Sequence, residues 1–426
     1  MPENPALSRI GAMLLAGCLA WPGLAAAQPA PQKLASKAEP GLKPAKPEAA
    51  KPGEAKREDF RRFVEGLWPE ARARKISRET FDVAFRGVAP DPKIIALTKK
   101  QSEFVQPIWG YLAGAVGGTR ISRGREVAEQ WAAHLDRIER TYQVPRSVVL
   151  GIWGMETNFG SFIGGMPVIQ SLATLAYTRY RGDFFRNELL VAIEMIEHGH
   201  VDPSAMRGSW AGAMGHTQFM PSSFMRHAVD GDGDGRRDIW TSPADALTST
   251  ANYLRNHGWQ PGLPWGFEVA LPEGFDFRHH RQSFAGWSQL GVARMDRQPM
   301  PRSGEAMLFL PAGARGPAFL VTENYTVIKA YNSSDAYALG VAHLGDRILG
   351  GAAIAGEWPK SDPQLGKNER SEVQKRLATL GHYSGETDGK FGSKTREAVR
   401  EFQLARGLLP DGYADVAVLK ALRGTR

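Results

Sequence analysis

The stretch Val148-Val-Leu-Gly-Ile-Trp-Gly-Met-Glu-Thr-Asn-Phe-Gly160 decides the fold, because it is nearly all apolar and carries a single carboxylate, Glu156. At 3.6 residues per turn, Ile152, Trp153 and Phe159 share a helix face with Glu156. Apolar surroundings disfavour the charged form of a carboxyl group, so we expect a raised pKa for Glu156. A raised pKa suits a general acid near neutral pH, whereas the alternative is a buried Glu that pairs with an Arg for structural reasons.

Two glycines within this stretch predict that another part of the molecule, or a ligand, packs closely against its backbone. Gly151 and Gly154 each cost roughly 1 kcal/mol of helix propensity relative to Ala. A buried helix tolerates this cost where another helix or a ligand must come close to its main chain. We therefore expect a buried helix with a tightly packed neighbour.

The first residues predict an exported protein. The apolar run 10–24 is followed by Ala25-Ala-Ala-Gln28, which suits signal peptidase cleavage after Ala27, so residues 1–27 are a predicted signal peptide. The run is too short, and too soon interrupted, for a membrane span. A lipoprotein signal is the alternative, since Leu15-Ala-Gly-Cys18 resembles a bacterial lipobox and would lead to lipidation of Cys18. Either reading places the protein in the periplasm of a Gram-negative bacterium, soluble or anchored by lipid to the outer membrane.

Composition predicts a linker, a large unit and a small unit. Residues 28–55 are rich in Pro, Ala and Lys, and they lack the large apolar groups that would offset the entropy cost of ordering. A second polar, Pro-interrupted break at 356–366 separates a unit at 56–355 from one at 367–426. Cys18 is the only cysteine, so we expect no internal disulfide; a chain of 426 residues can bury a sufficient core without one.

The large unit is predicted to be mainly α, an α+β unit with a small strand-rich element. Short apolar runs with Gly and Pro turns between residues 267 and 326 predict strands. Besides the Glu156 segment, apolar periodicity predicts helices at 57–71, 77–86, 123–142, 170–177, 183–198, 221–228, 243–257 and 336–348.

Two further motifs carry polar side chains that could assist a lone acid. Ser209 to Pro221 is a Gly-rich segment with Gln218 before an apolar pair, which alone predicts only a tight turn between helices. Tyr331-Asn332 places an aromatic ring and an amide together. An uncharged Asn or Gln near a catalytic acid can orient the acetamido group of a sugar or hold a developing charge.

Taken in order, these motifs resemble the lytic murein transglycosylase B family, lysozyme-like enzymes that cleave the glycan strand of peptidoglycan. The matching segments are Gly151-Ile-Trp-Gly-Met-Glu-Thr-Asn-Phe-Gly160, Gly208-Ser-Trp-Ala-Gly-Ala-Met-Gly-His-Thr-Gln-Phe-Met-Pro-Ser222, Ala251-Asn-Tyr-Leu-Arg-Asn-His-Gly-Trp259 and Tyr331-Asn332. The resemblance implies that Glu156 is the single catalytic acid/base. It also implies a set of substrate-binding residues along the sugar cleft, of which the last matches less closely: Ser209, Gln218, Tyr253, Tyr331, Asn332, Tyr337 and Tyr111.

The resemblance implies a mechanism without a second carboxylate. Glu156 would protonate the glycosidic oxygen between N-acetylmuramic acid and N-acetylglucosamine, while the substrate's acetamido group stabilises the oxocarbenium ion. The ionised Glu156 would then deprotonate the muramyl C6 hydroxyl, which attacks C1 and gives a 1,6-anhydro product. Attack by water, as in a muramidase, is one alternative. An inactive wall-binding scaffold is another, although the intact Glu156, Gln218 and Tyr331-Asn332 argue against it.

An Asp-rich segment, Asp230-Gly-Asp-Gly-Asp-Gly-Arg-Arg-Asp238, resembles an EF-hand loop with Gly235 at position 6. Position 12 is Thr241 instead of Glu, and the family implies Asp245 as the last carboxylate. Asp245 also fits the third position of a helix capped by Ser242. The candidate metal ligands are Asp230, Asp232, Asp234, Arg236, Asp238 and Asp245.

Structural Ca²⁺ is the expected ion at this loop, and no metal is expected to be required for the chemistry. The alternative is an Asp/Gly turn without a metal. The ten histidines show no close pairing with a Glu of the zincin or amidase kind, so we do not expect a zinc site.

The small C-terminal unit resembles the three-helix peptidoglycan-binding domain of wall hydrolases, with a generic three-helix module as the alternative. Its two expected core stripes are Val373, Leu377 and Leu380, and Ala398, Val399 and Phe402. The net charge of +8 favours binding to an anionic polymer. The peptide carboxylates of peptidoglycan would provide such a polymer, and the sequence contains no nucleic-acid motif. We expect a monomer that acts on glycan strands and meets the membrane only through lipidation of Cys18.

Overall fold

The computed structural model describes residues 52–100 and 106–425. The predicted signal peptide and Cys18 lie outside these residues, as does the predicted linker up to residue 51. The first helix begins at Pro52, inside the segment predicted as linker. Among the described residues, no helix combines the length and the apolar character needed to cross a bilayer.

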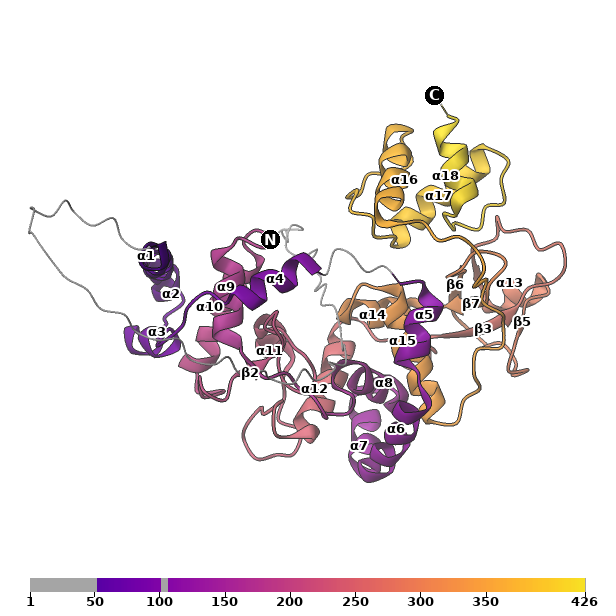
Figure 1. Ribbon diagram of the computed structural model, residues 1–426. Coiled ribbons are helices and arrows are strands. Elements are labelled where there is room, and N and C mark those ends of the chain that lie inside the picture. The colour runs from indigo at the N-terminus through magenta and orange to yellow at the C-terminus, as the bar shows by residue number, and fades with distance from the viewer. Residues whose placement is uncertain (1–51, 101–105, 426) are drawn as a thin grey trace, which may run out of the picture.

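The large unit is helical, with a β-sheet on one side, and the small C-terminal unit lies above that sheet in Figure 1. The helices of the large unit are α1 (Pro52–Glu65), α2 (Trp68–Ala73), α3 (Arg78–Ala84), α4 (Pro92–Lys100), α5 (Ile108–Ala115), α6 (Gly118–Gln130), α7 (Ala132–Tyr142), α8 (Arg146–Thr157), α9 (Val168–Tyr177), α10 (Phe184–Glu197), α11 (Pro221–His227), α12 (Pro243–Asn256), α13 (Phe284–Gln289), α14 (Glu323–Tyr331) and α15 (Asp335–Ile348). The C-terminal unit contains α16 (Lys367–Thr379), α17 (Ser393–Ala405) and α18 (Val416–Arg423).

The helix that carries Glu156, α8, packs closely against α15 because glycines remove the side chains between them. A Cβ added at Gly151 would lie 2.2 Å from the carbonyl oxygen of Val341 on α15. Conversely, a Cβ added at Gly345 of α15 would lie 2.1 Å from the carbonyl oxygen of Ser147. The close neighbour expected from the glycines of α8 is therefore α15.

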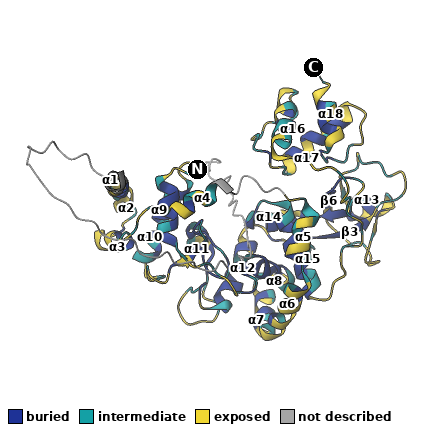
Figure 2. Cartoon of the chain, in the orientation of Figure 1, coloured by how far each residue is buried: buried dark blue, intermediate teal, exposed yellow. Residues whose placement is uncertain are grey.

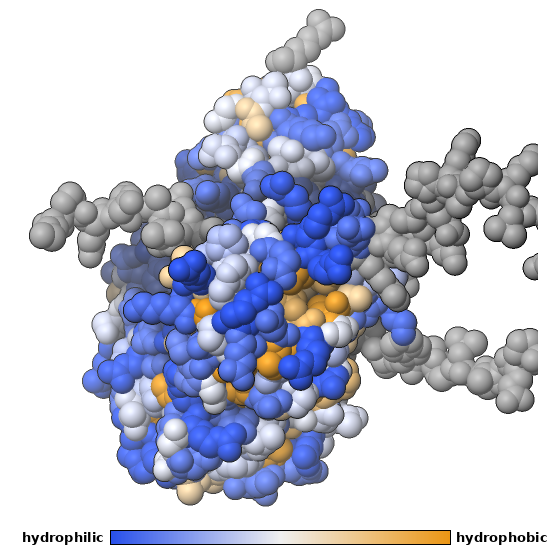
Figure 3. Space-filling view, turned by 90° about the vertical axis from the view of Figure 1, so that its left-hand side faces the viewer, coloured by the Kyte–Doolittle hydropathy of each residue, from blue (hydrophilic) through white to orange (hydrophobic). Residues whose placement is uncertain are grey.

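The main core surrounds this helix pair. In Figure 2, α8, α9 and α12 are dark blue along most of their length, which marks them as buried. On the face shown in Figure 3, hydrophobic side chains gather in a central area below the C-terminal unit, while most of the remaining surface is hydrophilic. The catalytic candidate Glu156 thus belongs to a helix that is held on nearly all sides by protein.

The strand-rich element predicted between residues 267 and 326 is a five-stranded antiparallel sheet of order β4-β6-β7-β3-β5. Its strands are β3 (Gly266–Ala270), β4 (Arg281–Ser283), β5 (Ala293–Arg294), β6 (Glu305–Phe309) and β7 (Ala318–Val321). Phe267, Trp287 and Leu320 help to form a second, separate core. A two-stranded pairing joins β1 (Met166–Pro167) to β2 (Arg207–Gly208) beside the main core.

Two predicted helices are wrong as single elements. The pattern over 123–142 forms α6 and α7, which are separated at Trp131, where φ is −103° and ψ is 14°. The break lets α6 pack on α15 while α7 packs on α12, so each half buries its apolar stripe against a different partner. The pattern over 57–71 is broken into α1 and α2 around Gly66, just before Pro69 in the first turn of α2.

The C-terminal unit has the predicted three helices, and the two expected stripes pack in one core with α18. Two buried glutamines hold its turns in the same way. The Gln374 side-chain oxygen accepts the Gly389 N–H at 2.7 Å, and the Gln403 side-chain oxygen accepts the Gly412 N–H at 2.8 Å. Both turns are therefore closed by a short local hydrogen bond from a helix.

The α8–α15 contact can be tested with Gly151→Ala. Because the new methyl group would meet main-chain atoms that cannot rotate away, we expect a loss of about 2–3 kcal/mol or more in the free energy of unfolding, measured by urea denaturation. Gly114→Ala is the matched control, since it is a helical glycine on α5 with open space around its Cβ, and it should be neutral or stabilising by up to about 1 kcal/mol. Equal effects of the two substitutions would contradict the close approach.

Candidate active site

Glu156 lies in the last turn of α8, and the chain turns sharply just after it. Asn158, Phe159 and Gly160 have positive φ angles of 49°, 59° and 77°. The Thr157 hydroxyl accepts the Gly160 N–H at 3.1 Å and donates to the His216 carbonyl oxygen at 3.1 Å. This turn therefore fixes the end of α8 against the Gly-rich segment 208–222.

The Glu156 carboxyl group is half-buried and has one strong hydrogen bond. The Tyr337 hydroxyl donates to Glu156 Oε1 at 2.6 Å. Burial raises the pKa of Glu156 to about 7, and the Tyr337 hydrogen bond opposes this rise by favouring the ionised form. In the described part of the chain these are the two influences on this pKa, so no charged side chain acts on Glu156.

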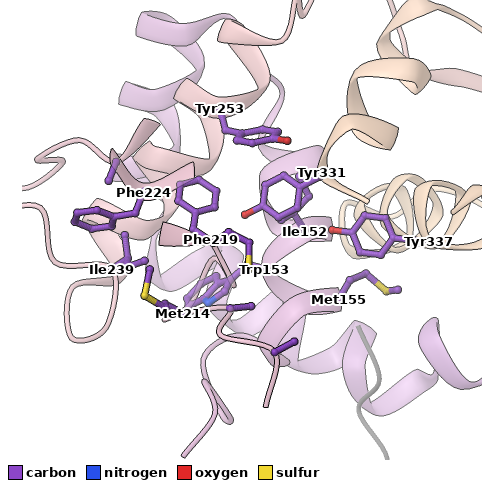
Figure 4. Packing of buried hydrophobic residues seen from close by; sticks show 14 of the residues in the cluster. Ile152, Trp153, Met155, Met214, Phe219, Phe224, Ile239, Tyr253, Tyr331 and Tyr337 are labelled. Carbon is purple, nitrogen blue, oxygen red and sulfur yellow. The ribbon is translucent and has the colours of Figure 1, made fainter. Parts of the chain in front are cut away.

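A group of tyrosines stands near the end of α8, and Figure 4 shows Tyr253, Tyr331 and Tyr337 on one side of Ile152 and Trp153. The Tyr331 hydroxyl donates to the Thr217 carbonyl oxygen at 2.6 Å, and the Tyr253 hydroxyl donates to the Ala330 carbonyl oxygen at 2.7 Å. The rings of Tyr253 and Tyr331 are 4.8 Å apart between centroids. These bonds join the end of α14 to α12 and to the Gly-rich segment.

Gln218 and Ser209 hold the Gly-rich segment in shape. The Gln218 amide donates to the carbonyl oxygens of Ile163 and Gly215, both at 3.0 Å. Since the NH₂ group is used within the protein, the side-chain oxygen of Gln218 is the part that can receive a donor from a ligand. The Ser209 hydroxyl accepts the Ala213 N–H at 3.1 Å, so this residue also supports the turn.

The remaining predicted cleft residues lie around α15. Asn332 is buried, and its side-chain oxygen accepts the Ser334 N–H at 3.2 Å just before α15 begins. Tyr111, on α5, is half-buried, and its ring lies against Gly340 of α15. The structure thus brings Tyr331, Tyr337 and Gln218 close to the end of α8. Tyr111 reaches this region from α5 and borders the same space at Gly340 as Met155 of α8.

Sequence reasoning did not assign a role to His216 or Trp153, which connect α8 to the Gly-rich segment. The Trp153 indole N–H donates to His216 Nδ1 at 3.0 Å. A Cβ added at Gly160 would lie 2.1 Å from the His216 ring, so the ring fills the space that this glycine leaves. The position of His216 inside the Gly-rich motif was the only sequence signal for this contact.

The Asp-rich loop brings three carboxylates together: ligand atoms of Asp230, Asp232 and Asp245 lie within 4.8 Å of one another. Asp245 is fully buried at the start of α12, and its carboxylate accepts the Gly231 and Asp238 N–H groups at 2.7 and 2.6 Å. Its N–H also donates to the Ser242 hydroxyl at 3.2 Å, so the predicted helix-cap role is present as well. Burial raises the pKa of Asp245.

The other predicted ligands lie outside this three-carboxylate group. Asp234 Oδ1 accepts the Arg236 N–H at 2.8 Å, and Asp238 Oδ1 accepts the Trp240 and Thr241 N–H groups, both at 2.9 Å. Three hard oxygen ligands, one of them fully buried, fit a calcium ion in their chemistry, because a divalent cation would compensate the buried charge of Asp245.

Comparison with known proteins gives the family. Residues 59–346 match the transglycosylase SLT domain family, and residues 366–422 match the putative peptidoglycan binding domain family. The chain belongs to the lytic murein transglycosylase B family. This confirms the resemblance, the mainly α lysozyme-like fold and the small peptidoglycan-binding domain predicted from the sequence, and it places the chain among the peptidoglycan lytic transglycosylases.

Individual relatives agree with this assignment. The membrane-bound lytic murein transglycosylase B of Escherichia coli K12 is 35% identical over 236 residues, which are 54% of this chain and 63% of the length of that protein. The crystal structure of SltB3 from Pseudomonas aeruginosa in complex with NAG-anhNAM-pentapeptide is 46% identical, covers 85% of this chain and 99% of SltB3, and superimposes with a TM-score of 0.79. Escherichia coli Slt35 in complex with calcium is 28% identical over 69% of this chain and 94% of Slt35, with a TM-score of 0.58.

The hydrogen bond between Tyr337 and Glu156 predicts a shift in the pH profile. Tyr337→Phe removes the donor that favours the ionised carboxylate, so the pKa of Glu156 should rise further above 7. A general acid must be protonated, and the descending limb of kcat/KM for peptidoglycan should therefore move to higher pH. Tyr142→Phe, a half-buried tyrosine on α7, is the matched control and should leave the limb in place. A limb that stays put, or moves to lower pH, with Tyr337→Phe would sink this interpretation.

Proposed function

We propose that the protein cleaves the β-1,4 bond between N-acetylmuramic acid and N-acetylglucosamine in peptidoglycan without water, and that Glu156 is its single acid/base. The observation that carries this proposal is the state of Glu156. It is a lone carboxyl group with a pKa of about 7, half-buried and hydrogen-bonded to Tyr337. Such a group is protonated in a large fraction of molecules near neutral pH, and it can take the proton back within one turnover.

In the first step Glu156 donates its proton to the glycosidic oxygen, and the bond from the muramyl C1 to that oxygen breaks. The bond electrons leave with N-acetylglucosamine, whose hydroxyl now holds the proton, and the acetamido group of the muramyl residue stabilises the positive charge at C1. In the second step the ionised Glu156 removes the proton of the muramyl C6 hydroxyl, whose oxygen bonds to C1. Glu156 is protonated again, and no water is consumed.

The neighbouring side chains support these proton transfers. The Tyr337 hydroxyl, whose pKa is raised well above 10 by burial and by Glu156, stays protonated and can stabilise the carboxylate between the two steps. The side-chain oxygen of Gln218 can accept a donor from the substrate, such as an acetamido N–H. Tyr331 holds the segment 208–222 in position through its hydrogen bond to the Thr217 carbonyl oxygen.

A hydrolytic muramidase on the same fold is the second candidate, because water could reach C1 in place of the C6 hydroxyl. Two observations favour the anhydro product. No charged side chain of the described residues acts on Glu156, whereas hydrolytic glycosidases generally use a pair of carboxylates. The similar SltB3 has been crystallised with NAG-anhNAM-pentapeptide, and NAG-anhNAM is a 1,6-anhydro sugar unit.

We further propose a periplasmic location, through cleavage after Ala27 or lipidation of Cys18, and a monomer that works on glycan strands. The relatives include both membrane-bound and soluble transglycosylases of bacteria, which agrees with either form. The C-terminal domain, which matches a peptidoglycan binding family, would hold the enzyme on the wall.

The products of digestion test the reaction and its acid together. Purified peptidoglycan treated with the enzyme should release muropeptides lighter by one water than ordinary reducing-end products, as measured by mass spectrometry. Glu156→Gln should lower the rate of their release by about 10²- to 10⁴-fold or more, since the amide cannot donate or accept the proton. Glu129→Gln, an exposed glutamate on α6, should leave the rate unchanged.

The other outcomes distinguish the alternatives. Reducing-end products that still depend on Glu156 would identify a muramidase and refute the anhydro route. Absence of products from both proteins, while each still pellets with the wall, would identify a scaffold.

We also propose that the Asp-rich loop binds structural Ca²⁺ through Asp230, Asp232 and Asp245. A bound calcium ion would supply positive charge that holds the loop on α12. Calcium at one hundred times its dissociation constant should then raise the free energy of unfolding by about 2.7 kcal/mol, seen as a higher Tm in thermal denaturation. Asp232→Asn should remove most of this gain, whereas Asp202→Asn, at an exposed site outside the loop, should keep it. A Tm that does not respond to calcium in the wild type would refute the site.

A further inference from the structure

The segment between the two domains is fixed to the catalytic domain. The N–H groups of Ala355 and Gly356 donate to the carboxylate of Glu268 on β3, at 2.8 and 2.7 Å. Farther along, Arg315 forms an ion pair with Asp362 at 2.6 Å. The linker is therefore held to the catalytic domain through Glu268 and Arg315, and these contacts help to fix the position of the C-terminal domain beside the sheet (Figure 1).

The C-terminal domain also contacts the catalytic domain directly. Asp411 accepts the Ala314 N–H at 3.0 Å. Arg396 of α17 donates to Asp335 at 2.6 Å, and its guanidinium lies 5.0 Å from the centre of the Phe309 ring on β6. Arg396 is thus a residue of the wall-binding domain that reaches into the catalytic domain.

The partner of Arg396 is a buried carboxylate whose two oxygens have different cationic partners. The Asp335 side chain is only 10% exposed, and its other oxygen pairs with Lys329 at 2.7 Å. Without Arg396, Lys329 still balances the charge of Asp335, but the second carboxylate oxygen loses its hydrogen-bond donor. A buried oxygen without a donor is costly, so the surrounding chain has to shift or admit water. The donor to this oxygen belongs to the other domain.

Asp335 is also the first residue of α15, the helix that delivers Tyr337 to Glu156. Tyr337 lies in the same turn, and its hydroxyl donates to Glu156 at 2.6 Å. The Asp335 carbonyl oxygen accepts the Tyr325 hydroxyl at 3.0 Å, which ties this turn to α14. A shift of Asp335 therefore moves the turn on which the Tyr337–Glu156 hydrogen bond depends.

We propose that Arg396 is a positioning residue for the reaction: by pairing with Asp335, the wall-binding domain holds the first turn of α15 and thereby the hydroxyl that meets Glu156. The domain then serves catalysis itself as well as attachment to the wall. This inference rests on the proposed function, since it concerns the geometry of the same acid/base.

The test uses the full chain and soluble, uncross-linked glycan strands, whose turnover does not need attachment to an insoluble wall. Arg396→Ala should lower kcat for anhydro-product release by about tenfold, because small misplacements at a catalytic group are costly, and should leave KM within about twofold. Arg396→Lys, which keeps the charge, should recover part of the loss. Lys394→Ala removes an exposed charge from the same helix and should match the wild type.

A double-mutant cycle tests whether Arg396 acts through Asp335. Asp335→Asn should show a loss in kcat similar to that of Arg396→Ala, and the double variant should lose no more than either single variant. Pelleting with insoluble peptidoglycan, measured in the Glu156→Gln background, should be unaffected by Arg396→Ala. If Arg396→Ala does not unfold cooperatively, it is not a valid test, and Arg396→Lys is compared with Lys394→Ala instead. Equal kcat values for these two variants and the wild type would refute the inference.

An unchanged kcat on soluble strands together with weaker pelleting would overturn the proposal, because Arg396 would then serve only attachment. Additive losses in the double variant would also overturn it. Failure of the wild type to release anhydro products from any substrate would instead refute the proposed function, and the inference with it, so the two failures are distinguishable.

Discussion

The site depends first on the close approach of α8 and α15. Glycines at Gly151 and Gly345 let each helix touch main-chain atoms of the other, and this brings the carboxyl group at the end of α8 within hydrogen-bond distance of a hydroxyl at the start of α15. A single larger side chain at either position would separate the two groups, which come from positions 181 residues apart in the chain. The hydrogen bond between Glu156 and Tyr337 is therefore a product of helix packing.

The electrostatics of Glu156 follow from that packing. Burial of the carboxyl group beside the packed helices α8 and α15 raises the pKa of Glu156, and only the Tyr337 hydroxyl opposes this rise. A nearby Arg or Lys would favour the ionised form and lower the pKa, which would leave no proton to donate. Because no charged side chain of the described residues acts on Glu156, its pKa stays near neutral pH.

The burial of Glu156 could be predicted from the sequence because its apolar neighbours recur at helical spacing. The closely packed neighbour of α8 could be predicted because the helix carries two glycines. The strand-rich element could be predicted from short apolar runs between Gly and Pro turns, and the core stripes of the C-terminal domain from their helical spacing. The break at Trp131 was not predictable, because the apolar stripe continues through it and only the choice of different partners for α6 and α7 bends the chain. The contact between Trp153 and His216, and the pairing of Arg396 with Asp335, join distant positions and leave no local pattern at all.

The two glutamine-closed turns of the C-terminal domain have a consequence for how the chain folds. Gln374 and Gln403 each reach a glycine only 15 and 9 residues farther along, and the helices they join are neighbours in sequence. Contacts between residues close in sequence cost little loop entropy to form, and proteins dominated by them fold quickly. This small domain can therefore reach its native state before the catalytic domain, whose central helix pair must bring together segments nearly two hundred residues apart. The folded C-terminal domain would then present Arg396 to Asp335 when α15, the last helix of the catalytic domain, packs into place.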